Sequence, residues 1–308
     1  MAHDLKKNAP LIIKAALGLL EEELTLGQLV YRDFDSDFAG KQGDTVNVKR
    51  PARLTAEDIG FRSSNRQVTG QDLVESTFPV KLREYPVNAV DLSDEEMTLD
   101  VENFGSQVLQ PQVEAIARYI EARLAFEMQA NTVTGALGAK TDGSDLLAKI
   151  TRARKLLNDR NVSRGGRILL VGSAVEEALL NLAILTEADK SGTTEALREA
   201  ILGRLRGFTV VGSNQIDEDV AIAYHPTAFA LITRAPVIPD GASFGAATSY
   251  GGYAMRWIKD YDASRLSDRS VLGTFMGIEP IKDPVDLADI DGAQSMQRAV
   301  RIDLDVAP

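Results

Sequence analysis

The sequence contains no cysteine and only two histidines, His3 and His225. Disulfide bonds, thiolate metal sites and cysteine nucleophiles are therefore excluded, and a zinc site would have to recruit several carboxylates. No apolar run reaches the roughly 18 residues that a membrane-spanning helix needs. Positive charge is also in deficit, because the formal net charge is −11. An acidic chain is not steered to phosphate by its overall field, which argues against sequence-specific nucleic-acid binding.

The chain has 308 residues, with 44% apolar and 26% charged residues. These values are typical of a soluble globular protein with a sizeable core, and exclude a disordered or collagen-like chain. Near the N-terminus, Lys14 interrupts the apolar run and three consecutive glutamates follow it, which does not fit a signal peptide. We therefore expect synthesis in the cytoplasm and no membrane association.

The longest helical pattern lies at residues 104–133. Its apolar residues recur three or four apart and form one stripe, and Asn131, Thr132 and Gly135 supply a stop signal. Pro111 fits the first turn of a helix, and Gln112 and Glu121 are assigned to the polar surface. The stripe comprises Leu109, Val113, Ile116, Ile120, Leu124 and Met128. One long amphipathic spine helix is predicted.

Residues 5–30 carry a second amphipathic pattern ahead of this helix. Such a segment needs a surface to cover. Two alternatives stay open, namely packing on its own domain or reaching a neighbouring subunit.

Two extended segments, 44–50 and 68–82, flank a polar stretch with few large apolar residues. Pro51 ends the first segment, and alternation of apolar and polar residues marks both as strands. A two-stranded ribbon is marginal in water by itself, so this hairpin must lean on another surface. Its basic residues are the candidate contacts to a neighbouring subunit: Arg50, Arg53, Arg62 and Arg66.

The rest of the chain mixes helices and strands. Capping boxes are expected where Ser93 precedes Glu96 and where Ser173 precedes Glu176. A helix is predicted at 142–157, strands at 167–171, 208–211, 220–224, 228–233, 253–261 and 270–277, and a loop or hairpin tip at 241–252. The predicted class is therefore α+β.

No catalytic constellation emerges. Ser173 stands between a strand and a helix, but the second glycine of a nucleophile elbow is missing and His225 has no recognisable partner. Paired carboxylates such as Glu95 and Glu96 lie in polar stretches and are interpreted as surface charge. We predict no catalytic, cofactor or metal site, although a structural cation in the acidic segment 283–291 remains open.

Two segments, 206–214 (RGFTVVGSN) and 228–236 (AFALITRAP), resemble the tailed-phage major capsid proteins. Residues 253–257 (YAMRW) through Met276 and Gly277, with the pair Tyr261 and Asp262, look like the late strands of that family. The order of parts carries more weight than any single motif, and the resemblance covers almost the whole chain.

The resemblance implies the Hong Kong 97 phage capsid fold. Its parts would be an N-terminal arm (1–38), an extended β-hairpin loop (39–86), a peripheral domain with the spine helix (87–140 and 236–268) and an axial α/β domain (141–235 and 269–308). The implied function is a shell subunit that forms hexamers and pentamers and encloses double-stranded DNA without binding it specifically. Scaffolding and portal proteins would be separate partners, and assembly in the host cytoplasm would end in the virion.

Two alternatives remain from the sequence. The same fold would suit an encapsulin-type bacterial nanocompartment, which a neighbouring cargo-enzyme gene would favour. A soluble enzyme based on carboxylates alone is the other, and turnover abolished by one carboxylate substitution would support it.

Overall fold

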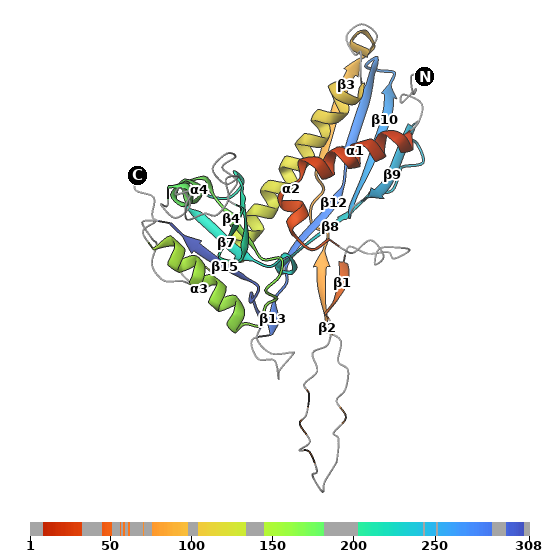
Figure 1. Cartoon of the computed structure of the whole chain (residues 1–308). Coiled ribbons are helices and arrows are strands. Elements are labelled where there is room, and N and C mark those ends of the chain that lie inside the picture. Colours follow the sequence, from red (N-terminus) through yellow and green to blue (C-terminus); the bar gives the residue numbers. More distant parts are fainter. Residues whose placement is uncertain are drawn as a thin grey trace.

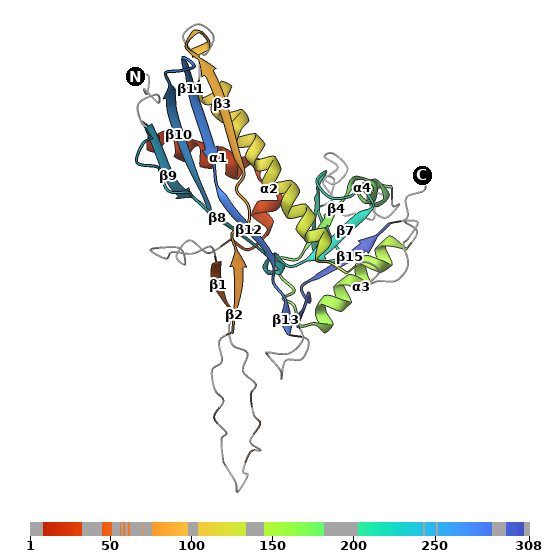
Figure 2. The same ribbon diagram turned by 180° about the vertical axis from the view of Figure 1, so that it is seen from behind.

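The structure is a computed structural model that describes residues 9–32, 45–50, 56, 58, 61, 70, 76–97, 104–133, 145–181, 203–242, 244–250, 252–284 and 294–304. Two sheets lie at opposite ends of the long helix α2 (Gln110–Ala130), and a narrow hairpin projects away from both (Figure 1). The reverse view shows the same elongated arrangement (Figure 2). No described helix combines the length and apolarity needed to cross a lipid bilayer.

The spine helix is confirmed, because every residue of the predicted stripe is buried. A π-helical turn, η4 (Gly105–Leu109), leads directly into α2, so helical backbone already runs before Pro111. The wider π turn gives room for a proline ring, which would otherwise meet the carbonyl of the preceding turn. At the other end, the Asn131 side chain donates to the Glu127 carbonyl and the Thr132 hydroxyl donates to that of Met128.

The assignment of Gln112 to the surface is wrong. Its side chain is buried, and its amide donates to the Ser270 carbonyl at 3.0 Å. The Ser270 hydroxyl donates back to the Gln112 carbonyl oxygen at 2.9 Å and accepts the indole N–H of Trp257 at 2.9 Å. Every polar group in this buried network is therefore paired, which ties the helix to the sheet beneath it.

A four-stranded antiparallel sheet packs along α2 in the order β3-β11-β10-β9. Its strands are β3 (Val87–Ser93), β9 (Phe244–Tyr250), β10 (Tyr253–Asp262) and β11 (Ser267–Gly273). The glycine-rich run expected to be a loop or hairpin tip thus contains a full strand, β9, because β10 supplies its ladder of partners, and it ends at the turn between these two strands. The capping box after β3 is confirmed: the Ser93 hydroxyl accepts from the Glu96 N–H, and the Glu96 carboxylate accepts from the Ser93 N–H.

The strand predicted at 270–277 is interrupted at Thr274. Residues before it belong to β11, and those after it form β12 (Phe275–Pro280), which pairs instead with β8 (Phe229–Arg234) in a two-stranded ribbon. The Thr274 hydroxyl is buried and donates to the Ala254 carbonyl at the break. A short 3-10 turn, η5 (Pro226–Ala228), precedes β8.

A five-stranded mixed sheet occupies the other end of the molecule in the order β15-β7-β4-β6-β5. Its strands are β4 (Ile168–Val171), β5 (Arg204–Leu205), β6 (Phe208–Gly212), β7 (Val220–Tyr224) and β15 (Ala299–Asp303). One face packs on α3 (Leu146–Asp159) and α4 (Ser173–Leu180), and the other faces the core around α2. The predicted helical stripe of α3 is confirmed: Leu146, Ile150, Ala153 and Leu157 are buried.

The capping box expected at Ser173 is not formed. Gly172 is the N-cap, Ser173 is the exposed first residue of α4, and its side chain makes no capping hydrogen bond. The Glu218 carbonyl instead accepts the N–H groups of Ala174 and Val175. A backbone carbonyl from a distant turn therefore caps α4 in place of the side chain that the sequence predicted.

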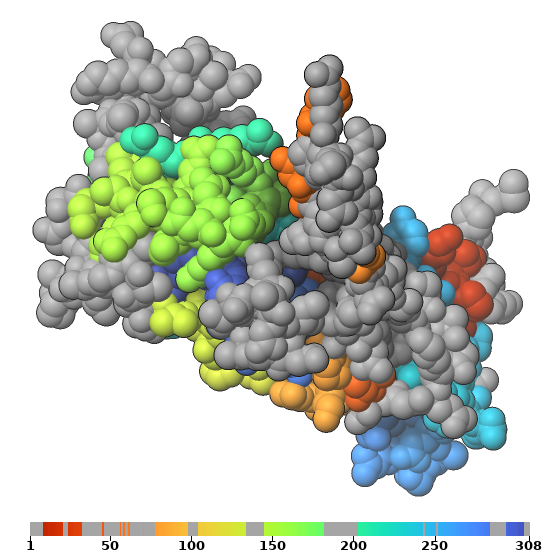
Figure 3. All heavy atoms as spheres, turned by 90° about the horizontal axis from the view of Figure 1, so that it is seen from below, coloured from red at the N-terminus to blue at the C-terminus, as the bar shows by residue number. Residues whose placement is uncertain are grey.

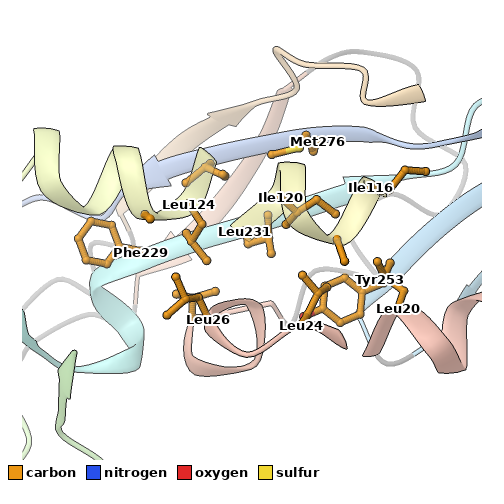
Figure 4. Packing of buried hydrophobic residues seen from close by; sticks show 14 of the residues in the cluster. Leu20, Leu24, Leu26, Ile116, Ile120, Leu124, Phe229, Leu231, Tyr253 and Met276 are labelled. Carbon is orange, nitrogen blue, oxygen red and sulfur yellow. The ribbon is translucent and has the colours of Figure 1, made fainter. Parts of the chain in front are cut away.

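The N-terminal segment packs on its own chain. Helix α1 (Ala9–Glu23) and the 3-10 turn η2 (Leu26–Leu29) bury their apolar side chains in the same core as α2, β8 and β10. Figure 4 shows Leu20, Leu24 and Leu26 facing Ile116, Ile120 and Leu124 of α2. Of the two alternatives for residues 5–30, the structure thus shows packing on the same chain for α1 and η2.

Candidate assembly surfaces

The projecting hairpin consists of β1 (Thr45–Arg50) and β2 (Ser76–Lys81), paired antiparallel as predicted. Its root is anchored because Phe78 and Val80 are buried against Ala230, Ile232 and Ile281. The ladder pairs Thr45 with Lys81 at this root and Arg50 with Ser76 at the end toward the tip.

Of the candidate contact residues, the structure therefore places only Arg50, at the point where the described ladder ends. Arg53, Arg62 and Arg66 lie outside the described residues. Whether these arginines gather on one surface stays a prediction.

The β8–β12 ribbon holds both the arm and the hairpin root. On its β8 side, Tyr31 donates its N–H to the Phe229 carbonyl and accepts the N–H of Leu231. On its β12 side, Met276 exchanges backbone hydrogen bonds with Glu84, just beyond β2. The arm and the hairpin root are thus held at opposite edges of one ribbon.

The hairpin root is also fixed to the spine helix by side chains. The Glu84 carboxylate accepts from the Tyr119 hydroxyl at 3.0 Å and forms an ion pair with Arg123. Arg123 bonds in turn to Glu127 at 2.8 Å. Burial and the adjacent Glu84 carboxylate both raise the pKa of the Tyr119 hydroxyl. The direction in which the hairpin leaves the body is therefore set by contacts with α2.

Glu121 connects the spine helix to the arm, which the sequence analysis missed by assigning it to the surface. Its side chain is buried, and its two carboxylate oxygens accept the N–H groups of Leu26 and Gly27, each at 3.0 Å. These donors open the 3-10 turn η2, where an anion is favoured. Burial raises the pKa of Glu121, whereas the N–H groups of Gly27, Leu26 and Thr25 lower it.

The sequence gives little indication of this clamp between Glu121 and η2, because Glu121 and Gly27 are 94 residues apart in the chain. The one sequence feature that hints at it is that Glu121 adjoins the apolar stripe, whose Ile120 and Leu124 are both buried.

Two residues considered for chemistry, His225 and Asp283, have structural partners. The Nδ1 atom of His225 accepts the N–H of Thr227 and thereby caps η5. Asp283, in the acidic segment considered for a cation, forms a bidentate ion pair with Arg298 at 2.6 Å for both contacts. Residues 285–291 of that segment lie outside the described residues. Within the described ranges, no group of three or more acidic or histidine side chains could hold a metal ion.

Comparisons with known proteins agree with this architecture. The family model described as "Phage capsid protein" matches residues 75–284. Comparison with curated protein sequences finds no match. A solved structure from Mycobacterium phage Che8 is 20% identical with a TM-score of 0.62, covering 91% of this chain and 90% of that chain.

Two further solved structures extend the comparison. The capsid of Ralstonia phage GP4 is 10% identical with a TM-score of 0.58, covering 91% of this chain and 88% of that chain. A virus-like particle from Pyrococcus furiosus is 14% identical with a TM-score of 0.54, covering 95% of this chain and 98% of that chain. The family match extends from the second strand of the hairpin through the spine helix to the end of β13 (Asp283–Pro284). The chain therefore belongs to the phage capsid protein family and has the Hong Kong 97 fold.

Proposed function

We propose that this chain is the major capsid protein of a tailed bacteriophage. Identical copies assemble into hexamers and pentamers, and these build an icosahedral shell around double-stranded DNA. The observation that carries the proposal is the family match over residues 75–284, which includes α2 and most strands of both sheets. The elongated shape supports it as well, because the hairpin projects from the body and, among its described residues, Phe78 and Val80 at the root pack on the chain's own core.

We assign four parts to this subunit: the arm at 1–38, the extended loop at 39–86, the peripheral domain around α2, and the axial domain around the five-stranded sheet. The boundary expected after residue 268 falls within β11, which pairs along its length with β10 and β3. We therefore place all of β11 in the peripheral domain.

The subunit's role in this proposal is structural and not enzymatic. Its net charge of −11 disfavours tight binding of packaged DNA, so the closed wall and not affinity would confine the genome. Scaffolding and portal functions are assigned to separate proteins. Assembly takes place in the host cytoplasm, and the product is the virion.

A second candidate function is an encapsulin-type compartment. It is favoured by the likeness to the Pyrococcus furiosus virus-like particle, which covers nearly the full length of both chains. The contents of the particle distinguish the two functions, since a phage shell encloses DNA and a compartment encloses cargo protein.

The direct test is assembly of the purified full-length chain, followed by sedimentation velocity and negative-stain microscopy. Closed shells of uniform diameter are the expected result. A chain that remains monomeric over a wide range of protein and salt concentrations, with or without co-expressed scaffolding protein, would contradict the proposal. If shells form in cells, enclosed DNA that is protected from added nuclease would favour the phage role, and a co-purifying enzyme would favour the compartment.

A further inference from the structure

Arginines gather at one end of the five-stranded sheet. Strands β4 and β6 run parallel, so their first residues share one edge of the sheet. Arg164 lies just before β4, and Arg204 and Arg206 lie in the β5 hairpin just before β6. Arg154 reaches the same edge from α3, and all these side chains belong to exposed residues. We call Arg154, Arg164, Arg204 and Arg206 the basic end.

The turn at the basic end holds an arginine in a backbone conformation that is unfavourable for this residue type. Arg206 has φ 50° and Gly207 has φ 86°, so both central residues of the two-residue hairpin are in the left-handed region. Asparagine, aspartate or glycine is favoured at the first position of such a turn, and arginine adopts it at a cost. A Cβ on Gly207 would lie 3.2 Å from the Arg154 guanidinium carbon, so Arg154 lies directly over the turn.

No ion pair neutralises the basic end within the described residues. None of its four arginines pairs with a carboxylate there, and Asp159 on α3 is paired with Lys155. Burial lowers the pKa of the nearby Arg167 guanidinium, and Arg154 and Arg164 lower it further. Concentrating repulsive charge in this way is unfavourable unless an anionic partner binds there. In a chain of net charge −11, it is also unexpected by composition.

Carboxylates gather at the opposite end of the same two strands. Helix α4 begins after the last residue of β4 and carries Glu176 and Glu177. The connection between β6 and β7 carries Asp217 and Glu218, and the Glu218 carbonyl receives the first N–H groups of α4, so the two segments are adjacent. Glu177, Asp217 and Glu218 are exposed. We call Glu176, Glu177, Asp217 and Glu218 the acidic end.

We propose that the basic end of one subunit binds the acidic end of a second copy of this chain, head to tail, within a ring of axial domains. This inference rests on the proposed shell function, because it requires repeated copies. The two ends of one chain cannot meet, since β4 alone separates them by roughly 13 Å of extended strand. Two different patches on identical subunits form a heterologous contact, which closes into a ring when the rotation allows.

The second copy is favoured over nucleic acid as the partner. A site for DNA phosphates would explain the basic end alone, and the acidic end of the same small domain would repel the duplex. Head-to-tail pairing uses both ends and reduces the repulsion between acidic subunits. Figure 3 shows α3 on the surface of the molecule as seen from below, and Arg154 of this helix is exposed, so a neighbouring copy can reach it.

The test is a reciprocal charge swap in the full-length chain. One variant carries Arg204→Glu and Arg206→Glu, a second carries Glu177→Arg and Asp217→Arg, and a third carries all four substitutions. The third has the net charge of the parent, and glutamate at position 206 keeps the side-chain cost of the turn comparable. The assembled fraction is measured by sedimentation velocity, and thermal unfolding of the free subunit controls for folding.

We expect the assembled fraction of each two-site variant to be lower than that of the parent by about tenfold or more. Many weak contacts change from attraction to repulsion together. The four-site variant should recover assembly. An equimolar mixture of the two-site variants should restore contacts in alternating hexamers, whereas each pentamer would keep one like-charged contact. Parent-level assembly of either two-site variant, or failure of a folded four-site variant, would overturn the proposal.

A second experiment measures the binding of a short DNA duplex to the subunit. If the parent subunit binds the duplex, and Arg204→Glu/Arg206→Glu abolishes that binding while still assembling, the basic end is a nucleic-acid site and the proposal is wrong. Failure of the parent itself to assemble would instead count against the proposed shell function.

Discussion

Replacing Glu121 should detach the N-terminal arm from the spine helix. In the folded chain its carboxylate accepts two buried backbone N–H groups, each at 3.0 Å. Glu121→Gln keeps one acceptor oxygen but turns an amide donor toward the other N–H, which should cost about 1–3 kcal/mol of unfolding free energy. Glu121→Leu leaves both donors unpaired, and we expect about 2–4 kcal/mol after apolar contact by the leucine offsets part of the loss.

Urea unfolding of the unassembled subunit measures these differences, and limited proteolysis reports whether the segment around Gly27 becomes accessible. Glu114→Gln is the matched control, because Glu114 is partly exposed on the same helix and pairs with the exposed Arg118 at 3.4 Å. That exposed pair should be worth at most about 1 kcal/mol. If Glu121→Leu is as stable and as protease-resistant as Glu114→Gln, the clamp does not hold the arm and the reasoning fails.

Four further predictions follow from the same structure. Burial raises the pKa of Glu121 above its ordinary 4.5, so the folded chain binds this proton more tightly than the unfolded chain. This stability contribution is complete below pH 4.5 and is lost as pH rises through the folded-state pKa; identical pH dependence of urea unfolding in Glu121→Gln would refute it. Ile120→Ala should cost about 2–5 kcal/mol and give insoluble or proteolysed subunit, whereas normal shells from Ile120→Asp would contradict the burial of this face. Arg53→Glu with Arg62→Glu should leave thermal unfolding unchanged but yield free subunits in sedimentation, as high salt should in the parent; parent-level assembly at low salt would show the hairpin tip to be passive. His225→Gln should leave shell yield and morphology unchanged, and loss of a hydrolytic activity present in the parent would count against a purely structural role.

The spine helix illustrates what local pattern can predict. Spacing alone identified its buried stripe, because a helix places residues three or four apart on one side whatever they pack against. The Ser93 capping box was equally predictable, since both partners lie within one turn. The paired strands of the projecting hairpin also followed from alternation and from Pro51.

Predictions failed where the partner is remote in sequence. Ser173 has the local signature of a cap, but a carbonyl from Glu218 takes that role. The glycine-rich run before Tyr253 lacks a strand signature, and it becomes β9 because β10 offers a complete ladder. Thr274 divides one apparent strand into two, since the chain leaves one sheet for another at that point.

The sequence by itself determined the amphipathic elements, their order and, through that order, the family. Only the tertiary structure decided where charge is buried and where it gathers. The sequence places Glu121 on the surface, because the N–H group of Gly27 that it accepts lies 94 residues away. The burial of its carboxylate is tolerated because such backbone donors offset the desolvation cost. The arginines of the basic end are scattered between residues 154 and 206, and the parallel pairing of β4 with β6 brings them to one edge. Local spacing fixes the face of an element, whereas electrostatic neighbourhoods depend on which elements the fold makes adjacent.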